Sequence, residues 1–328
     1  MPAKKYIAVV GGAGYIGSHM VRMLLDHGYS PVVFDNLRTG HRRFVPGGVP
    51  FVKGNLDRPT DIQRLFERYP TRAVMHFAAA SIVPESVRNP LLYYHNNVSA
   101  CIHLAQVMID FKIREIVFSS TAAVYGHPKK VPIPETARLA PVNAYGHTKR
   151  MIEQILEDVA FAHHLRYVFL RYFNVAGAHP SGKIGEEHRP ETHLVPNILK
   201  SLKRSKNRFF LFGDDYPTRD GTCIRDYIHV QDLCAAHLLA LRHLDNKKDS
   251  DVFNLGSGKG YTVRQVIDMV EQVTGQPVQY TVKPGREGDP VKLVASSRKA
   301  RDVLGWMPTH SLKDMIASAW QWEQNRSA

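Results

Sequence analysis

A tyrosine and a lysine four residues apart are the pair in this sequence best suited to proton transfer. Tyr145 and Lys149 form Tyr-x-x-x-Lys at the start of an amphipathic stretch, and in a helix this spacing places both on one face, one turn apart. An isolated tyrosine titrates near about 10 and is a poor base at neutral pH, but a neighbouring positive charge favours the phenolate. Tyr145 is therefore a candidate acid/base for a substrate hydroxyl. Alone the pattern is common, and an ordinary helix face is the alternative.

A run of hydroxyl side chains lies upstream of this pair. Ser119, Ser120 and Thr121 follow the apolar residues Ile116–Phe118. A hydroxyl at the end of a buried strand can orient a substrate and share its proton, although such a run is more often a strand end and turn. The order of the two motifs behind a nucleotide-binding loop makes the combination specific.

That loop is glycine-rich. The apolar run Tyr6–Val10 leads into Gly-Gly-Ala-Gly-Tyr-Ile-Gly over Gly11–Gly17 and then into a helical pattern. Glycines permit a tight turn and close approach of backbone to a pyrophosphate, which a helix N-terminus also attracts. Asp35 ends the next apolar run, where a carboxylate accepts hydrogen bonds from ribose hydroxyls and repels a 2′-phosphate. NAD is therefore favoured, with NADP kept open by Arg38; a structural glycine turn with a surface aspartate is the alternative.

Alternating patterns predict the elements that position these residues. Apolar runs indicate buried strands at Tyr6–Val10, Pro31–Asp35, Ala73–Ala78, Glu115–Ser120, Tyr167–Phe173 and Val252–Leu255. Amphipathic spacing indicates helices at Ile16–His27, Asp61–Tyr69, Ser99–Phe111 and Tyr145–His163. This alternation predicts an α/β fold with a Rossmann-type, doubly wound parallel sheet and a smaller C-terminal α/β lobe. We expect a dinucleotide-binding domain over 1–173 with a return segment at 223–257, and a substrate-binding lobe over 174–222 and 258–328.

Composition narrows the function further. The 328 residues carry a net charge of +13, which permits nucleic-acid binding but equally fits attraction of small anions. The basic residues are scattered apart from the run 200–208, so we expect no nucleic-acid partner. No apolar run approaches a membrane span or a signal peptide, so no membrane is expected. The three cysteines lack metal or redox spacing, which indicates no metal ion and a reducing, cytoplasmic setting.

Taken together, these motifs resemble the extended short-chain dehydrogenase/reductase family, and within it the enzymes that epimerise UDP-hexoses at C4. The matching segments span nearly the whole chain: Gly11–His19, Asp35–Leu37, Met75–Ala79, Tyr93–Val98, Phe118–Gly126, Tyr145–Lys149, Arg171–Gly177, Gly213–Tyr216, Gly221–Val230, Asn254–Gly256 and Arg286–Asp289.

The resemblance implies a set of site residues. The catalytic residues would be Tyr145, Lys149 and Thr121. The residues contacting NAD would be Gly11, Gly14, Tyr15, Ile16, Gly17, Asp35, Asn36, Asn55, Leu56, Phe77, Ala78, Ala79, Ser81, Asn96, Ser119, Tyr145, Lys149 and Phe173. The residues contacting the UDP-sugar would be Thr121, Tyr145, Asn174, His193, Leu194, Phe212, Arg225, Arg286, Asp289 and Leu293.

Several positions depart from the family pattern. Asn55 stands where an aspartate is frequent, Ser81 where some members have lysine, and His193 where an asparagine is frequent. His193 is either a substrate contact or a histidine packed beside Pro196. Leu293 stands at a position that helps to set the size of the hexose pocket, and a leucine would narrow it.

The implied activity is interconversion of UDP-glucose and UDP-galactose. C4 is oxidised with NAD as hydride acceptor, the 4-keto sugar rotates, and hydride returns to the opposite face. A 4-epimerase acting on UDP-N-acetylhexosamine or UDP-pentose is the alternative. A dehydratase of the same fold would carry an acid after the Ser/Thr position, where this chain has Ala122 and Ala123. A non-catalytic NAD-binding regulator would usually lack the Tyr-Lys pair.

The resemblance also implies a homodimer. The contact would involve two helices, Leu91–Phe111 and the one beginning at Tyr145. Both have more apolar residues than one buried face requires: Leu104, Val107, Met108, Ile152, Ile155, Leu156 and Val159. The alternative is that these residues only cover the sheet.

Overall fold

The computed structural model describes residues 4–203, 209–246, 248–286 and 289–326. The chain forms two compact units. Unit 1 comprises Met1–Gly126, Leu139–Arg171 and Cys234–Phe253, and unit 2 comprises His127–Arg138, Tyr172–Leu233 and Asn254–Ala328. The functional domain boundaries expected from the sequence differ from these units mainly at 127–138 and 223–233, and they stay a prediction.

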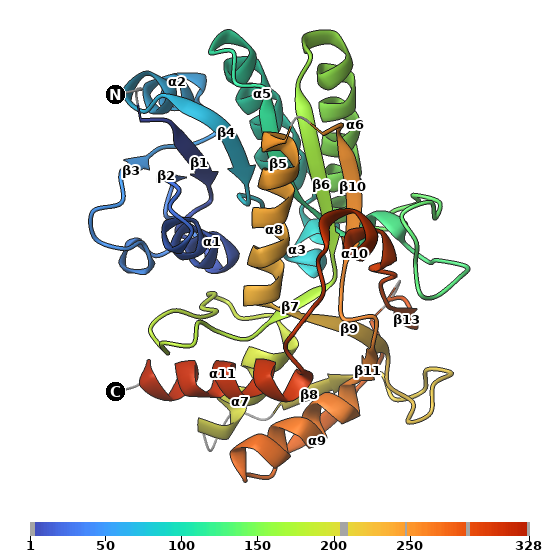
Figure 1. Cartoon of the computed structure of the whole chain (residues 1–328). Coiled ribbons are helices and arrows are strands. Elements are labelled where there is room, and N and C mark those ends of the chain that lie inside the picture. The colour runs from blue at the N-terminus through green and yellow to red at the C-terminus, as the bar shows by residue number, and fades with distance from the viewer. Residues whose placement is uncertain (1–3, 204–208, 247, 287–288, 327–328) are drawn as a thin grey trace. The chain divides into compact units, whose positions relative to one another are not determined.

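A seven-stranded sheet is the framework of unit 1 (Figure 1). Its strands are β1 (Tyr6–Val10), β2 (Pro31–Asp35), β3 (Phe51–Lys53), β4 (Thr71–His76), β5 (Glu115–Thr121), β6 (Arg166–Tyr172) and β10 (Asp251–Leu255). Their order is β10-β6-β5-β4-β1-β2-β3, and the pairings from β3 through β5 are parallel. The Rossmann-type fold expected from the sequence is therefore confirmed, and each expected strand lies within two residues of its observed bounds.

Helices cover both faces of this sheet. They are α1 (Tyr15–Asp26), α2 (Pro59–Arg68), α3 (Val83–Arg88), α4 (Pro90–Tyr93), α5 (Ala100–Asp110), α6 (Ala144–His163) and α8 (Val230–Asp245), with short 3-10 turns η1 (Arg42–Phe44) and η3 (Ala122–Tyr125). One core cluster joins α2, α5 and α6 to the sheet. On the other face, Cys234 of α8 contacts the Ile16 carbonyl of α1. Burial on both faces explains why the strands are apolar without alternation.

The helix expected over Leu91–Phe111 is not uniform. Between α4 and α5 the backbone forms the π-helical segment η2 (Tyr94–Ser99). Its buried Asn97 accepts a hydrogen bond from the Ala80 backbone N–H at 2.8 Å and donates one to Thr148 Oγ1 at 3.1 Å. Asn97 therefore ties η2 both to the chain after β4 and to α6. Such π segments are frequent at functional sites.

The apolar residues expected to be spare on these two helices mostly cover the sheet. Leu104, Val107, Met108, Ile152 and Leu156 are all buried in the core of unit 1, and Ile155 and Val159 are half-buried. The alternative interpretation is therefore correct for the buried five. Other apolar residues of the same elements are exposed instead, namely Leu91, Ile102, Met151 and Phe161.

Unit 2 is built from shorter elements. They are β7 (Asn174–Ala176), β8 (Phe209–Phe212), β9 (Ile224–His229), β11 (Gly260–Thr262), β12 (Tyr280–Lys283), β13 (Lys292–Leu293), α7 (Leu194–Lys203), α9 (Val263–Thr274), α10 (Arg298–Leu304) and α11 (Leu312–Asn325). Strand β9 pairs with β11, β13 and β7, while β8 pairs with β12. Helices α7, α9 and α11 pack into one core with these strands. No helix within the described residues is long and apolar enough to cross a membrane.

Candidate active site and nucleotide-binding residues

The catalytic candidates lie at the start of α6. Asn143 caps this helix, because its side chain accepts a hydrogen bond from the Gly146 backbone N–H at 2.8 Å. Tyr145 and Lys149 follow in the first two turns, so the cap fixes where both side chains leave the backbone. The sequence predicted the helix within one residue at its N-terminus.

Lys149 is buried, with 3% of its surface exposed. Its ammonium donates a hydrogen bond to the Ser119 carbonyl at 2.8 Å and lies 4.7 Å from the centre of the Phe118 ring. Burial lowers the pKa of Lys149 to about 8, although Cys101 and Glu153 oppose the shift. The lysine is therefore a positioned, partly desolvated cation next to the end of β5.

Tyr145 and Thr121 are directly connected. The Thr121 hydroxyl oxygen accepts a hydrogen bond from the Ala123 N–H at 3.2 Å, which leaves its own proton to donate to the Tyr145 phenol oxygen. This hydrogen bond lowers the pKa of Tyr145, but burial outweighs it and raises that pKa to about 12. Among the groups of the chain itself, burial therefore outweighs the stabilisation of the phenolate, and the role of Tyr145 as acid/base stays a prediction. The physical reason is that burial penalises the charged phenolate.

A buried ion pair that the sequence analysis missed holds α6 against the sheet. Arg171 of β6 donates two hydrogen bonds to Glu153 at 2.8 and 2.7 Å, and Ser120 donates a third to the same carboxylate at 2.6 Å. Arg171 also donates to the Tyr125 hydroxyl at 3.0 Å. Glu153 lies one turn after Lys149, and its charge on a core-facing position of a helix was the signal for a buried partner.

The glycine loop meets the demands of a dinucleotide. Gly11 has φ +80°, and a side chain there would come within 2.6 Å of the Ala78 backbone nitrogen. At Gly17 a Cβ would lie 2.2 Å from the Gly11 carbonyl oxygen, so only glycine lets the helix start this close to the strand. Gly14 caps α1 without a side-chain hydrogen bond, and no acidic residue lies in the first turn. Tyr15 and Ile16 begin α1, whose N-terminus is therefore suited to a phosphate.

Asp35 lies at the C-terminal end of β2 beside this loop. Its two carboxylate oxygens accept hydrogen bonds from the Ala13 N–H at 3.0 Å and the Leu37 N–H at 2.8 Å. Burial raises the pKa of this carboxyl group, and both hydrogen bonds oppose the shift. Each oxygen keeps a second lone pair for a ribose hydroxyl. The residues present therefore fit NAD, and Asn36 follows as an exposed residue that accepts from the Arg38 N–H.

The other residues expected to contact NAD differ in how deeply they are buried. Phe77, Ala78 and Ala79 follow β4 and are half-buried, as are Asn55 and Asn96, whereas Ser81 is exposed. Leu56 and Phe173 are buried. The Ser119 hydroxyl is fully buried and bonded to His237 Nε2 at 2.9 Å, so Ser119 offers its carbonyl to Lys149 and its side chain to His237. The roles of these residues toward NAD stay predictions.

The residues expected to bind the UDP-sugar, apart from Thr121 and Tyr145, all belong to unit 2. Arg225 of β9 pairs with Asp289 at 3.0 Å, and Leu293 of β13 lies opposite Arg225 in the sheet register. The Arg286 guanidinium lies 4.3 Å from the centre of the exposed Phe212 ring. This arrangement collects two arginines, an aromatic ring and a carboxylate.

Three further expected contacts lie at other elements of unit 2. Asn174 of β7 is exposed, is registered opposite Tyr227, and makes a side-chain hydrogen bond with it. His193 and Leu194 lie at the start of α7. His193 is half-exposed, and its Nδ1 lies 2.6 Å from Glu186 Oε1 and 3.4 Å from Glu191 Oε1, so carboxylates, not only Pro196, surround it. These two carboxylates raise the pKa of His193 to about 10.

The contacts of His193 with Glu186 and Glu191 belong to a group of four side chains that the sequence analysis missed. Glu186, His188, Glu191 and His193 place their side-chain donor atoms within 4.8 Å of one another. The signal was present in the spacing Glu-x-His-x-x-Glu-x-His, which contains no cysteine. The sequence analysis expected no metal ion.

Comparison with known proteins places this geometry in a family. The model of the NAD dependent epimerase/dehydratase family matches residues 7–256. The chain belongs to this family. It is 50% identical over 320 residues to the UDP-glucose 4-epimerase of Lactobacillus helveticus, covering 97% of both chains.

Solved structures agree with this assignment. The chain superimposes with a TM-score of 0.96 on a crystal structure of a UDP-glucose 4-epimerase, at 48% identity and 98% coverage of both chains. It also matches the UDP-glucose 4-epimerase from Bifidobacterium longum in complex with NAD+ and UDP, with a TM-score of 0.94, 37% identity, and 98% and 99% of the two chains covered.

Proposed function

We propose that this chain is an NAD-dependent enzyme that interconverts UDP-glucose and UDP-galactose. The observation that carries the proposal is the Tyr145 phenol hydrogen-bonded to Thr121, on a helix that also holds the buried Lys149. The relatives matched over nearly their whole length are named UDP-glucose 4-epimerases, which supports the same reaction here.

Bound NAD supplies a hydride acceptor and donor for C4 of the hexose and, when oxidised, a positive charge close to the reacting atoms. The chain supplies the proton transfers. Tyr145 takes the proton of the C4 hydroxyl at its phenol oxygen and returns it when the sugar is reduced. Thr121 donates its hydroxyl proton to the phenolate and so stabilises it. Lys149 is held by the Ser119 carbonyl as a fixed positive charge on the same face of α6.

Binding of the substrate is assigned to unit 2. Arg225 and Arg286 present guanidinium groups suited to the two phosphates, since arginines form charge-assisted, forked hydrogen bonds to phosphate oxygens. Asp289 accepts from the uridine ribose, Phe212 and Leu194 lie near the uracil, and Asn174 contacts the UDP moiety. A firm hold on UDP leaves the hexose as the loosely held part, which the rotation of the 4-keto sugar requires.

The residues after Thr121 argue against dehydration. Ala122 and Ala123 form the first part of η3 and carry no group that donates or accepts a proton. Loss of water from a sugar needs an additional acid and base beside the tyrosine. The site therefore supports oxidation and re-reduction at one carbon only.

The sugar preference is assigned to Leu293. This residue is half-buried on β13, next to Arg225 in the register, and a leucine leaves less room than a small side chain for an N-acetyl group. We therefore expect UDP-glucose and UDP-galactose to be preferred over their N-acetylated forms, with UDP-pentoses as a second candidate class.

Two measurements on purified protein test this function. UDP-galactose and UDP-N-acetylgalactosamine are offered separately, and the expected result is rapid formation of UDP-glucose and much slower turnover of the N-acetyl sugar. Equal rates would overturn the preference, and no conversion of either would overturn the activity. Denaturing the protein without added cofactor and measuring absorbance shows whether NAD is released, as retention between half-reactions requires.

A homodimer and a cytoplasmic location complete the proposal. The exposed Leu91, Ile102, Met151 and Phe161 support a self-contact, because Phe161 in particular leaves 91% of its surface in solvent. The cysteines Cys101, Cys223 and Cys234 are free and buried, which suits a reducing compartment. Light scattering should give twice the chain mass, and Phe161→Ser together with Leu91→Ser should lower it; a monomeric wild type would contradict the dimer.

A further inference from the structure

We propose that Glu186, His188, Glu191 and His193 of unit 2, named here the Glu/His cluster, bind a divalent transition-metal ion, with Zn²⁺ as the best match. The proposal depends on side-chain geometry and does not depend on the function proposed above. Two imidazole nitrogens and two carboxylate oxygens are a donor set that suits zinc. The four ligands come from eight consecutive residues that end at the start of α7.

The distances between donor atoms are the first support. Four donors bonded to zinc at about 2.0–2.2 Å in a tetrahedron lie roughly 3.3–3.6 Å from one another. In the Glu/His cluster, Glu186 Oε1 lies 2.6 Å from His193 Nδ1 and 3.2 Å from His188 Nδ1. Glu191 Oε1 lies 3.4 Å from His193 Nδ1 and 3.8 Å from His188 Nδ1. These four nitrogen–oxygen distances lie on both sides of the tetrahedral value, and shifts of less than about 1 Å would bring all four to it.

The bonding of His188 is the second support. Its Nδ1 is shielded from solvent and has no hydrogen-bond partner among the described residues, although two carboxylates lie near it. Buried ring nitrogens are rarely left without a partner in a native protein. A ring nitrogen placed between two carboxylates in this way can serve as a metal ligand once its proton is released.

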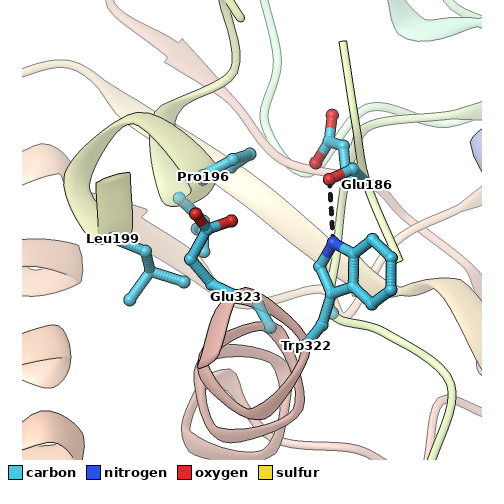
Figure 2. A pocket seen from close by; sticks show the side chains of 8 residues that line it. Glu186, Pro196, Leu199, Trp322 and Glu323 are labelled. Carbon is cyan, nitrogen blue, oxygen red and sulfur yellow. Dashed lines mark hydrogen bonds between the residues drawn. The ribbon is translucent and has the colours of Figure 1, made fainter. Parts of the chain in front are cut away.

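Neighbouring groups hold the Glu191 carboxylate and the Glu186 backbone in place. The second oxygen of Glu191 accepts from Lys200 Nζ at 2.9 Å, and Oε1 accepts from the Thr192 and His193 N–H groups at 2.9 and 3.1 Å. The Glu186 backbone carbonyl accepts from the Trp322 indole N–H at 3.1 Å, as Figure 2 shows. The two N–H groups fill both lone pairs of Glu191 Oε1, so a bound metal ion would replace one of these hydrogen bonds, while the Lys200 contact orients the other oxygen.

The two carboxylates of the cluster are buried, whereas the side chains of His188 and His193 are 27% and 46% exposed. The carboxylates of Glu186 and Glu191 are 7% and 6% exposed. A small pocket beside Glu186 is lined by Pro196, Leu199 and Trp322, together with the carboxylate of Glu323 (Figure 2). Four protein donors leave no open position for a reacting water, which makes the expected role structural. The metal would fix the segment before α7.

The competing arrangement is two histidine–carboxylate ion pairs without metal. Full-length protein without a histidine tag, treated with a chelator and then dialysed, is titrated with ZnCl₂ and analysed for bound metal. We expect one Zn²⁺ per chain and a melting temperature that rises with Zn²⁺ concentration. His188→Gln and Glu191→Gln should each weaken binding roughly tenfold or more.

His310→Gln is the matched control. His310 pairs with Asp232 at 2.8 Å in the same unit but lies outside the Glu/His cluster. It should bind Zn²⁺ like the wild type. Binding of less than one equivalent by the wild type, unchanged binding in both cluster variants, or an equal loss in His310→Gln would each overturn the proposal.

A second measurement needs no variant. Co²⁺ bound to the wild type in place of Zn²⁺ should give the intense visible absorption of a four-coordinate site, and added Zn²⁺ should remove it. The weak absorption of six-coordinate Co²⁺ would contradict the tetrahedral arrangement.

Discussion

The two units of the chain present functional side chains in different ways. In unit 1 the candidate residues stand at the ends of long buried strands or on α6, and the backbone or buried groups hold them: Lys149 binds the Ser119 carbonyl, and Asp35 accepts two backbone N–H groups. In unit 2 they lie on short strands and connecting segments and mainly contact one another, as Arg225 does Asp289 and Arg286 does Phe212.

This difference matches two chemical tasks. Proton transfer needs groups fixed to within fractions of an ångström, which favours rigid elements with buried partners. Binding a nucleotide diphosphate needs charged groups that can leave a partner for a phosphate, which favours exposed side chains paired with their neighbours. Of the two arginines in unit 2, Arg286 is exposed, whereas the Arg225 side chain is only 12% exposed. A substitution at Arg286 therefore tests the contrast with the buried residues of unit 1 best.

The largest expected effect is in unit 1. Tyr145→Phe removes the phenol that exchanges a proton with C4, and general acid–base catalysis contributes typically about 10²–10⁴-fold. We expect turnover of UDP-galactose to fall by about 10³-fold while the affinity for UDP is unchanged. Tyr6→Phe, a tyrosine that packs on Tyr69 in the same unit, is the control and should keep full activity. Substantial turnover by Tyr145→Phe would exclude this residue as the acid/base.

The corresponding change in unit 2 should alter binding alone. Arg286→Gln removes an exposed guanidinium without disturbing a core. Charge-assisted hydrogen bonds contribute about 1.5–3 kcal/mol each, so calorimetry should show UDP affinity weakened roughly tenfold to a hundredfold. NAD content and melting temperature should not change. Arg298→Gln, on an arginine 83% exposed and paired with Asp302 at 3.4 Å, is the control; equal weakening there would remove Arg286 from the site.

The difference between the two units also explains which strands could be predicted from the sequence. Strands of unit 1 are buried on both faces, so β1 and β2 are continuous apolar runs and were predicted at their observed bounds. In unit 2, β13 has two residues and β11 has three, too few for any periodicity to be recognised. After residue 173, only β10 was predicted, because it belongs to the long sheet.

For a related reason, some site residues could be predicted from the sequence and others could not. Local motifs identified Tyr145, Lys149 and the glycine loop, since their spacing along the chain is also their spacing in space. Partners that are distant in the sequence could not be predicted in this way. The pairing of Glu153 with Arg171, and that of Ser119 with His237 118 residues later, depend on which strands and helices become neighbours. The effect of burial on the pKa of Tyr145 could not be predicted from the sequence either, because burial is a property of the fold.

A substitution in the glycine loop tests whether NAD binding in unit 1 depends on the close approach of backbone segments. Gly17→Ala would put a methyl group 2.2 Å from the Gly11 carbonyl oxygen. Overpacking of this kind costs about 1–3 kcal/mol, so the melting temperature and the NAD retained on purification should both fall. UDP affinity should not. Gly47→Ala is the control, because a Cβ there meets no atom within 4 Å; a similar NAD loss in that variant would mean that the close approach at Gly17 is not the cause.

Each unit holds a buried histidine with a lowered pKa, and these two histidines allow the stability of the units in acid to be compared. Burial lowers the pKa of His76 in unit 1 to about 3 and that of His229 in unit 2 to about 4, with Lys149 and His310 adding to the respective shifts. Both values lie below the unfolded value of about 6.5. As the pH falls below that value, the unfolded chain takes up protons that the folded chain refuses, so stability is lost down to about pH 3–4 and is unaffected above pH 7.

The size of this effect can be measured unit by unit. Each histidine should cost about 2 kcal/mol of unfolding free energy between pH 7 and pH 5, and His76→Asn and His229→Asn should each remove that share. The tryptophans Trp306, Trp320 and Trp322 all lie in unit 2, so their fluorescence follows that unit, while circular dichroism follows both. His229→Asn should flatten the pH dependence seen by fluorescence, and His76→Asn only that seen by circular dichroism. If His76→Asn flattens both signals equally, the two units unfold as one, and the contrast between them is confined to their sites.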